Sequence, residues 1–117
     1  MANNIVHFEF AVKDINEGTE FYSKLFDWSI DKMPGAEYSL VNTGSGDTGG
    51  GIYTAPKGTK PFITVYVQVD DIDAKLSEAE ALGASIISQK TKISDDHGYF
   101  GMFRDPDGNM IGLWSKI

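Results

Sequence analysis

Alternating hydrophobic and polar positions near the start of the chain predict a β-strand over residues 5–12. One face of this strand carries Val6, Phe8, Phe10 and Val12. The other face carries His7, Glu9 and Ala11. Because successive side chains of a strand point to opposite sides of its sheet, the apolar set is expected to pack beneath a helix. The second set gives the other face an imidazole and a carboxylate, which could act on or bind a ligand.

Apolar residues at helical spacing follow this strand. Asp14, with Glu17 three residues later, forms a capping-box pattern and predicts a helix from there through Asp27. Two strands are predicted next, over residues 28–32 and 37–42, separated by the turn signal Pro34-Gly35. The glycine-rich run 44–51 is expected to form a mobile loop that enters a fourth strand, 52–54.

The pattern restarts after residues 55–61, which are rich in Pro, Gly and Lys. Shifting the chain by 57 residues aligns the two halves without a gap. The first-half positions are Phe8, Phe10, Val12, Asp14, Ile15 and Leu25. Their second-half equivalents are Val65, Val67, Val69, Asp71, Ile72 and Leu82. The second copy is predicted as strand 62–69, helix 71–82 stopped by Gly83, strand 85–89 and a closing β-hairpin.

The hairpin is defined by its turn, Asp105-Pro106-Asp107-Gly108. Pro106 presets the φ of the second turn position, the aspartates can accept hydrogen bonds from nearby backbone N–H groups, and Gly108 accepts a positive φ. The strands before and after this turn are apolar on both faces, so both faces are expected to be covered.

The two copies predict an α+β fold built from two tandem βαβββ modules within a single domain, 1–117. Module one covers 5–54, the linker 55–61 and module two 62–115. One helix covers only one face of a four-stranded sheet, so the other face of each half needs cover. We expect the two modules to form a curved mixed sheet, or half-barrel, with the helices outside and a cleft inside. An alternative is that side chains simply fill this space, as in small barrels.

The residues predicted to line the cleft are more polar than ordinary packing would favour. His7 and Glu9 form a candidate acid/base pair, because a carboxylate near an imidazole favours its charged form. A structural hydrogen bond between them is the competing interpretation. The predicted ligand-binding positions are Thr64, Tyr66, Gln68, Met110 and Trp114. Each polar group buried without a partner would cost about 1 to 3 kcal/mol, which favours a ligand cavity.

Composition narrows the choice of partners. The 117 residues carry a net charge of −7, which disfavours nucleic acid and anionic membrane surfaces and makes a neutral or cationic small ligand easier to bind. The absence of cysteine excludes disulfides, thiolate metal sites and a cysteine nucleophile. No basic and apolar leader pattern opens the sequence, so we expect a cytoplasmic protein.

The opening segment HFEFAVKDINEGTEFYSKLFDW, the βαβββ repeat and the closing FRDPDGNMIGLW together resemble the vicinal oxygen chelate superfamily. This superfamily includes lactoylglutathione lyase, bleomycin-resistance proteins and extradiol dioxygenases. The resemblance runs from Ile5 to Trp114 and is closest to small lactoylglutathione-lyase-related proteins. It implies the glyoxalase-like fold, whereas many different reactions share that fold.

The resemblance also implies that metal-dependent members bind a divalent ion through four side chains, on the first and last strands of each module. The first of these positions falls on His7, its second-module counterpart on Thr64, and the last-strand position of module two on Gly112. The fourth lies somewhere in 49–53, where there is no carboxylate or imidazole. One expected ligand remains, and a single imidazole does not hold a divalent ion against water.

Three functions therefore stay open. We expect the cleft to bind a small molecule without the usual four-ligand metal centre, with or without a reaction. A metal-dependent lyase or dioxygenase would need a rebuilt site, for which His7, Glu9 and His97 are the candidate ligands. A bleomycin-type antibiotic-binding resistance protein would suit the acidic charge. The resemblance and the need to cover edge strands also favour a homodimer.

Overall fold

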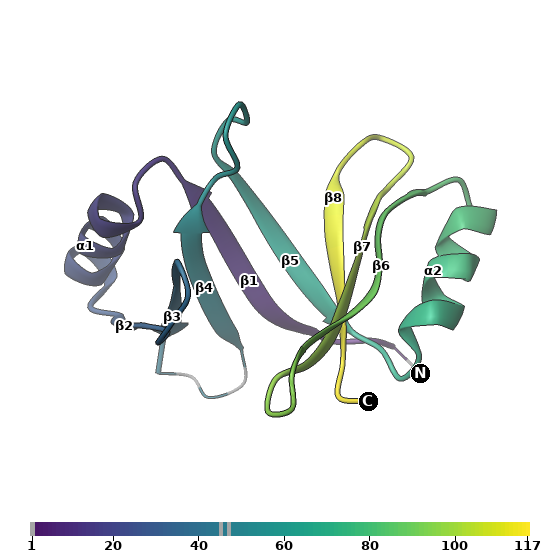
Figure 1. Cartoon of the computed structure of the whole chain (residues 1–117), viewed down its shortest axis with the longest axis horizontal. Helices are drawn as coiled ribbons and strands as arrows, with labels where there is room; N and C mark the ends of the chain where they lie inside the picture. Colours follow the sequence, from purple (N-terminus) through teal and green to yellow (C-terminus); the bar gives the residue numbers. More distant parts are fainter. Residues whose placement is uncertain (1, 45, 47) are drawn as a thin grey trace. The chain divides into compact units, whose positions relative to one another are not determined.

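The computed structural model describes residues 2–44, 46 and 48–117 (Figure 1). Ser45 and Asp47, which belong to the predicted glycine-rich loop, lie outside the described residues. The chain divides into two compact units. One unit is Val6–Thr64, and the other consists of Val65–Ile117 with the residues that precede Val6. Each unit follows the expected order of one strand, one helix and three strands, which confirms the α+β class.

The first unit contains β1 (Ile5–Val12) except its first residue, together with α1 (Ile15–Phe26), β2 (Ser29–Lys32), β3 (Tyr38–Asn42) and β4 (Gly49–Thr54). Its strands are ordered β2-β3-β4-β1. β1 runs parallel to β4, and the remaining pairs are antiparallel. The helix α1 packs against this sheet (Figure 1).

The helix α1 starts as its capping signal predicts. The Asp14 carboxylate accepts hydrogen bonds from the backbone N–H groups of Asn16 and Glu17, at 2.9 and 3.0 Å. The helix ends at Phe26, and its C-cap residue Asp27 adopts the left-handed conformation. Beneath α1, a buried cluster joins the helix to the apolar face of β1, as expected. Its members are Ile15, Val41 and Ile52, packed against Phe8, Phe10, Val12, Tyr22, Trp28 and Ile30.

The glycine run does not follow the prediction of a loop over 44–51. Gly49, Gly50 and Gly51 are already strand residues, paired with β1. The physical reason is close packing of aromatic rings on both sheet faces. A Cβ at Gly50 would overlap the ring of Phe8, and a Cβ at Gly51 would overlap the phenol of Tyr38. The strand thus begins three residues earlier than its β-branched residues suggest.

The second unit contains α2 (Ile72–Ala81), β6 (Ser85–Ser94), β7 (Gly98–Arg104) and β8 (Met110–Ser115), and most of β5 (Phe62–Gln68). Its strands are ordered β5-β8-β7-β6, with β5 parallel to β8. Strand β6 is longer than the predicted 85–89 and contains register shifts. The helix α2 packs against β6, β7 and β8 through the buried cluster Val69, Ile72, Leu76 and Leu113.

The hairpin turn has the expected chemistry. The Asp105 carboxylate accepts hydrogen bonds from the backbone N–H groups of Asp107 and Asn109 and from the Asn109 side chain. The hydrogen bonds from Asn109, above all from its side chain, lower the pKa of Asp105. Gly108 has a φ of 97°, the conformation for which glycine was predicted there.

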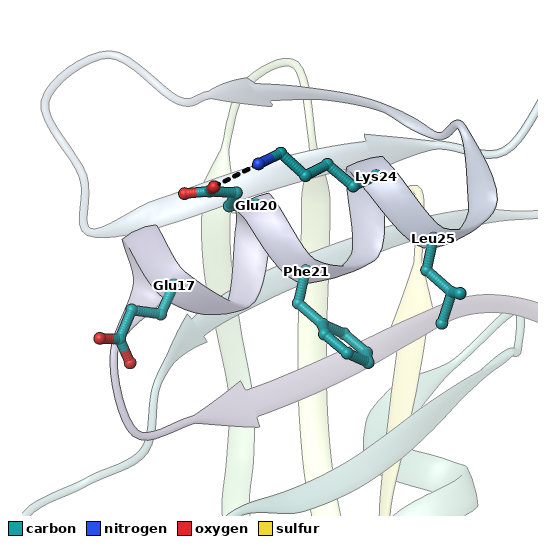
Figure 2. Close-up of a pocket in the computed structure, with 5 residues that line it drawn as sticks. All are labelled: Glu17, Glu20, Phe21, Lys24 and Leu25. Carbon is teal, nitrogen blue, oxygen red and sulfur yellow. Dashed lines mark hydrogen bonds and ion pairs between the residues drawn. The ribbon is translucent and has the colours of Figure 1, made fainter.

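The outer face of α1 carries a shallow pocket lined by Glu17, Glu20, Phe21, Lys24 and Leu25 (Figure 2). Phe21 and Leu25, although at helical spacing with the buried positions, are each 59% exposed. The Lys24 ammonium pairs with the Glu20 carboxylate at 2.6 Å. None of the predicted site residues lines this pocket. Among the described residues, no helix has the length and apolar character needed to cross a membrane.

Candidate functional site

The hydroxyl of Tyr38 connects the two residues of the predicted acid/base pair. It lies 2.8 Å from Nε2 of His7 and donates a hydrogen bond to Oε2 of Glu9, also at 2.8 Å. His7 and Glu9 come from β1 and Tyr38 from the start of β3, so the bridge joins residues about thirty positions apart. All three side chains are partly buried. The structure thus brings His7 and Glu9 together through a third residue.

Strand register and one glycine create the room for this bridge. Glu9 lies opposite Gly51 in the β1–β4 pair, and Leu40 lies opposite Gly51 in the β3–β4 pair. The phenol of Tyr38, two residues before Leu40 on the same face, covers Gly51. Any larger residue at position 51 would occupy the space of the phenol. The sheet face opposite α1 therefore presents a continuous hydrogen-bonded chain, His7–Tyr38–Glu9.

Sequence reasoning missed Tyr38, although a signal for it exists. Val41 and Ser39 of β3 are buried, and Val41 belongs to the core beneath α1. By alternation, Tyr38 and Leu40 must then lie on the face that carries His7 and Glu9. The sequence does not reveal the register of β3 on β4. That register brings the Tyr38 hydroxyl between the side chains of His7 and Glu9.

Burial changes the acid–base properties of this face. It lowers the pKa of His7 below its ordinary value of 6.5. We expected the carboxylate of Glu9 to favour the charged imidazole. In the structure the Tyr38 hydroxyl lies between them, and loss of solvent around the ring is the larger effect. The neutral imidazole is therefore the dominant form at neutral pH.

A second tyrosine belongs to the same face. Tyr53 lies opposite Ala11 in the β1–β4 pair and stacks on Tyr38, with ring centroids 6.1 Å apart and planes inclined by 21°. Burial, and next the negative charge of Glu9, raise the pKa of Tyr53 to about 12. Its hydroxyl therefore stays protonated over the physiological range. The first unit presents an imidazole, a carboxylate and two phenols on one sheet face.

Thr64 is a predicted ligand-binding residue that the structure places in the first unit, at 1% exposure. Its hydroxyl has no hydrogen-bond partner among the described residues. A buried hydroxyl without a partner is rare in proteins and unfavourable by about 1 to 3 kcal/mol. Thr64 is therefore a polar group that a bound molecule or an ordered water would stabilise.

The other predicted ligand-binding residues belong to the second unit. Tyr66 lies opposite Gly112 in the β5–β8 pair, and its ring covers that glycine. Gln68 is exposed and lies opposite Trp114. Met110 begins β8 and shares the face of Gly112 and Trp114 by alternation. Whether these residues share a ligand with His7 and Glu9 stays a prediction.

Hydrogen bonds with Trp114 and Ser94 hold the loop that contains His97. The indole N–H of Trp114 donates to the backbone carbonyl of His97 at 2.7 Å. The Nδ1 atom of His97 lies 2.8 Å from Oγ of Ser94, and the same Oγ accepts the backbone N–H of His97. The side chain of His97 is exposed and is engaged with its own turn. The polar end of Trp114 is likewise used within the second unit.

Residues 4–113 match the family model described as glyoxalase/bleomycin resistance protein/dioxygenase superfamily. The chain belongs to this superfamily. Among curated proteins, "Putative glyoxylase CFP32" of Mycobacterium tuberculosis (strain CDC 1551 / Oshkosh) and its counterpart in Mycobacterium bovis are each 31% identical over 109 residues. That match covers 86% of this chain but only 41% of either relative.

Solved structures agree on the fold. The Mn(II)-bound glyoxalase from Novosphingobium aromaticivorans superposes with a TM-score of 0.73 at 18% identity, covering 99% of this chain and 40% of that chain. Methylmalonyl-CoA epimerase from Mycobacterium tuberculosis gives a TM-score of 0.72 at 14% identity, covering 97% of this chain and 87% of that one. At these identities the likeness concerns the fold, which is the glyoxalase-like fold expected from the sequence.

Strand register identifies the residue of β4 that is equivalent to Gly112 of β8. The repeat of 57 residues aligns Glu9 with Tyr66, so their strand partners Gly51 and Gly112 are equivalent. Each glycine is covered by a tyrosine ring, from Tyr38 and Tyr66 respectively. The resemblance implies metal ligands on the last strand of each module, and the structure has a glycine covered by a phenol ring at each of these two places.

The residues at the four positions do not fit a divalent ion. Only His7 offers a good donor, and its Nε2 atom is already hydrogen-bonded to Tyr38. Thr64 contributes a neutral hydroxyl, and the two glycines contribute no side chain. Such ions need three or four converging N or O ligands. The described residues contain no group of three or more His, Cys, Asp or Glu side chains arranged to hold a metal.

Proposed function

We propose that this chain is a small-molecule-binding member of the superfamily that uses the His7–Tyr38–Glu9 face of its first unit in place of the metal centre. The single observation that carries the proposal is the Tyr38 hydroxyl, 2.8 Å from both His7 and Glu9. A hydrogen-bonded chain of three partly buried side chains is costly to assemble unless it is fully satisfied. It also provides what a polar ligand needs, namely fixed donors and acceptors on a rigid sheet.

The face has a defined chemical preference. It combines one carboxylate, a neutral imidazole and the stacked phenols of Tyr38 and Tyr53. The chain as a whole carries a net charge of −7. This combination favours a neutral or cationic molecule with a planar part over a phosphate or a polycarboxylate.

The unpartnered hydroxyl of Thr64 supports the same proposal. It is the second-module equivalent of His7 under the 57-residue repeat, and it is buried in the unit that contains the bridge. A ligand that formed a hydrogen bond with this hydroxyl would offset the unfavourable free energy of burying it without a partner.

A ligand screen in the presence of EDTA tests the proposal. Saturation-transfer NMR with a library of neutral and cationic planar metabolites identifies binders to the wild-type protein. We expect at least one binder whose affinity falls about tenfold or more in His7→Ala, because a hydrogen bond to a buried group is lost. His97→Ala, which removes the exposed histidine, is the matched control and should leave affinity unchanged. Binders whose affinity is unchanged in His7→Ala would overturn the proposal, and so would binding that is seen only when a divalent ion is supplied in place of EDTA.

A further inference from the structure

The outer face of α1 exposes large apolar side chains next to one another. Phe21 and Leu25, one turn apart, are each 59% exposed, and Phe26 beside them is 52% exposed. Figure 2 shows Phe21 and Leu25 projecting from the helix together with the charged side chains of the same face. Adjacent apolar side chains in solvent mark an interaction surface more often than scattered ones do.

The second module shows that the fold does not require this apolar surface. The repeat of 57 residues places Glu78 of α2 at the position equivalent to Phe21. Glu78 is exposed and pairs with Lys75 at 3.2 Å. The helix α2 nevertheless covers its sheet, through Ile72 and Leu76. An aromatic ring at position 21 is therefore not needed to cover the sheet, and its exposure needs another explanation.

The charges of the same face are arranged along the helix axis. Glu17 lies in the first turn of α1 and Lys24 in the last. Phe21 lies between them, about 6 Å along the axis from Glu17 and about 4.5 Å from Lys24, at about 1.5 Å per residue. Within the part of the chain that the structure describes, no ion pair involves the carboxylate of Glu17. A helix laid antiparallel to α1 would meet its acidic end with a basic end, so this face is complementary to a reversed copy of itself.

We propose that the outer face of α1 is the contact surface of a homodimer, in which α1 packs antiparallel to α1 of a second copy about a two-fold axis near Phe21. A two-fold contact uses the same patch on both chains. Phe21 then packs against the partner's Phe21. Lys24 lies beside the partner's Glu17, because their distances from Phe21 along the axis differ by only about 1.5 Å. The antiparallel arrangement also places opposite ends of the two helix dipoles together.

Charge and size indicate what kind of association this is. Glu17, Glu20 and the net charge of −7 would repel an anionic membrane, which disfavours a lipid surface as the partner of this face. A helix of 12 residues is only about 18 Å long. The contact is therefore smaller than the standard interface of about 800 Å² per partner. We expect a weak, concentration-dependent dimer.

Sedimentation equilibrium tests the proposal. Between about 10 μM and about 1 mM, the apparent mass should rise from the 12.8 kDa of one chain towards twice that value. Phe21→Glu, which introduces the residue found at the equivalent position of α2, should weaken dimerisation about tenfold or more. Leu82→Glu, at a side chain outside α1 that is 75% exposed, is the matched control and should not change it. A mass that stays at one chain throughout, or a dimer that forms equally well in Phe21→Glu, would overturn the proposal.

A charge exchange tests the antiparallel arrangement. Glu17→Lys alone and Lys24→Glu alone should each weaken the dimer, because like charges then face each other. The double variant should restore dimerisation towards the wild-type level, since each lysine again faces a glutamate. Circular dichroism confirms that all variants are folded. A double variant that dimerises no better than either single variant would overturn the antiparallel contact. The result does not depend on whether the ligand screen finds a binder.

Discussion

The phenol of Tyr38 lies in the space that a side chain on Gly51 would occupy, so the bridge between His7 and Glu9 depends on the glycine at that position. Gly51→Ala should therefore displace Tyr38 and break both hydrogen bonds. Overpacking of this kind lowers the free energy of unfolding by about 1 to 3 kcal/mol. Urea denaturation followed by tryptophan fluorescence measures it.

Gly49→Ala is the control for that substitution. Gly49 lies two residues earlier on the same face of β4, and its added Cβ would meet Nδ1 of His7 at an ordinary 3.7 Å. The free energy of unfolding should change by less than about 1 kcal/mol, and a small gain is expected because alanine restricts the unfolded chain. Equal losses of unfolding free energy in Gly49→Ala and Gly51→Ala would contradict this account. They would mean that β4 requires glycine for its own backbone and not to make room for the ring of Tyr38.

The pH dependence of stability should report on His7. Its pKa is lower in the folded protein than the ordinary 6.5, so the unfolded chain binds more protons between the two values. The stability contribution of the neutral ring is therefore fully present above pH 6.5 and is lost as the pH falls through the folded pKa. Denaturation between about pH 5 and 8 should show this slope in wild type and in His97→Gln. His7→Gln should flatten it, and a slope that survives in His7→Gln would contradict the assignment.

Tyr53 should titrate above the ordinary range of a phenol. Burial and the charge of Glu9 raise its pKa to about 12, compared with 10.0 for a free phenol. Absorbance titration in the near ultraviolet, comparing wild type with Tyr53→Phe, isolates its ionisation. Glu9→Gln should lower the pKa of Tyr53, because it removes a negative charge, while burial keeps it above 10.0. An unchanged pKa of Tyr53 in Glu9→Gln would show that the charge of Glu9 does not affect Tyr53.

Removing the buried hydroxyl of Thr64 should not destabilise the protein, in contrast to the loss of stability expected for Gly51→Ala. Thr64→Val replaces a hydroxyl without a hydrogen-bond partner among the described residues by a methyl group of similar size. The free energy of unfolding should stay the same or rise by about 1 kcal/mol, since the desolvated hydroxyl contributes nothing in return. Thr54→Val, at an exposed position of β4, should change stability little and serves as the comparison. A loss above about 1 kcal/mol in Thr64→Val would reveal a structural bond to Thr64.

Most of the fold could be predicted from the sequence because its signals are local. Asp14 caps α1, Gly83 ends α2 with a φ of 105°, and Asp105 organises the hairpin turn. The alternation along β1 gave the face that packs under α1. The start of β4 was missed because Gly49–Gly51 has low strand propensity, which tertiary packing of Phe8 and Tyr38 overrides.

The candidate site was only half predictable. His7 and Glu9 follow from alternation within one strand, whereas Tyr38 joins them through the register of β3 on β4, a long-range property. The direction of the pKa shift of His7 was also missed, because it depends on burial by neighbours distant in sequence. The equivalence of Gly51 and Gly112 likewise required the strand pairs to be known.

Metal analysis of the purified, untagged protein tests the central claim most directly, because we propose that the His7–Tyr38–Glu9 face takes the place of a metal centre. Elemental analysis is combined with titration of Zn²⁺, Ni²⁺, Co²⁺, Mn²⁺ and Fe²⁺ into wild type and His7→Ala. With phenols over Gly51 and Gly112, we expect no stoichiometric ion in wild type and identical titrations for the two proteins. One equivalent of bound metal that disappears in His7→Ala would contradict this account and identify a rebuilt metal centre.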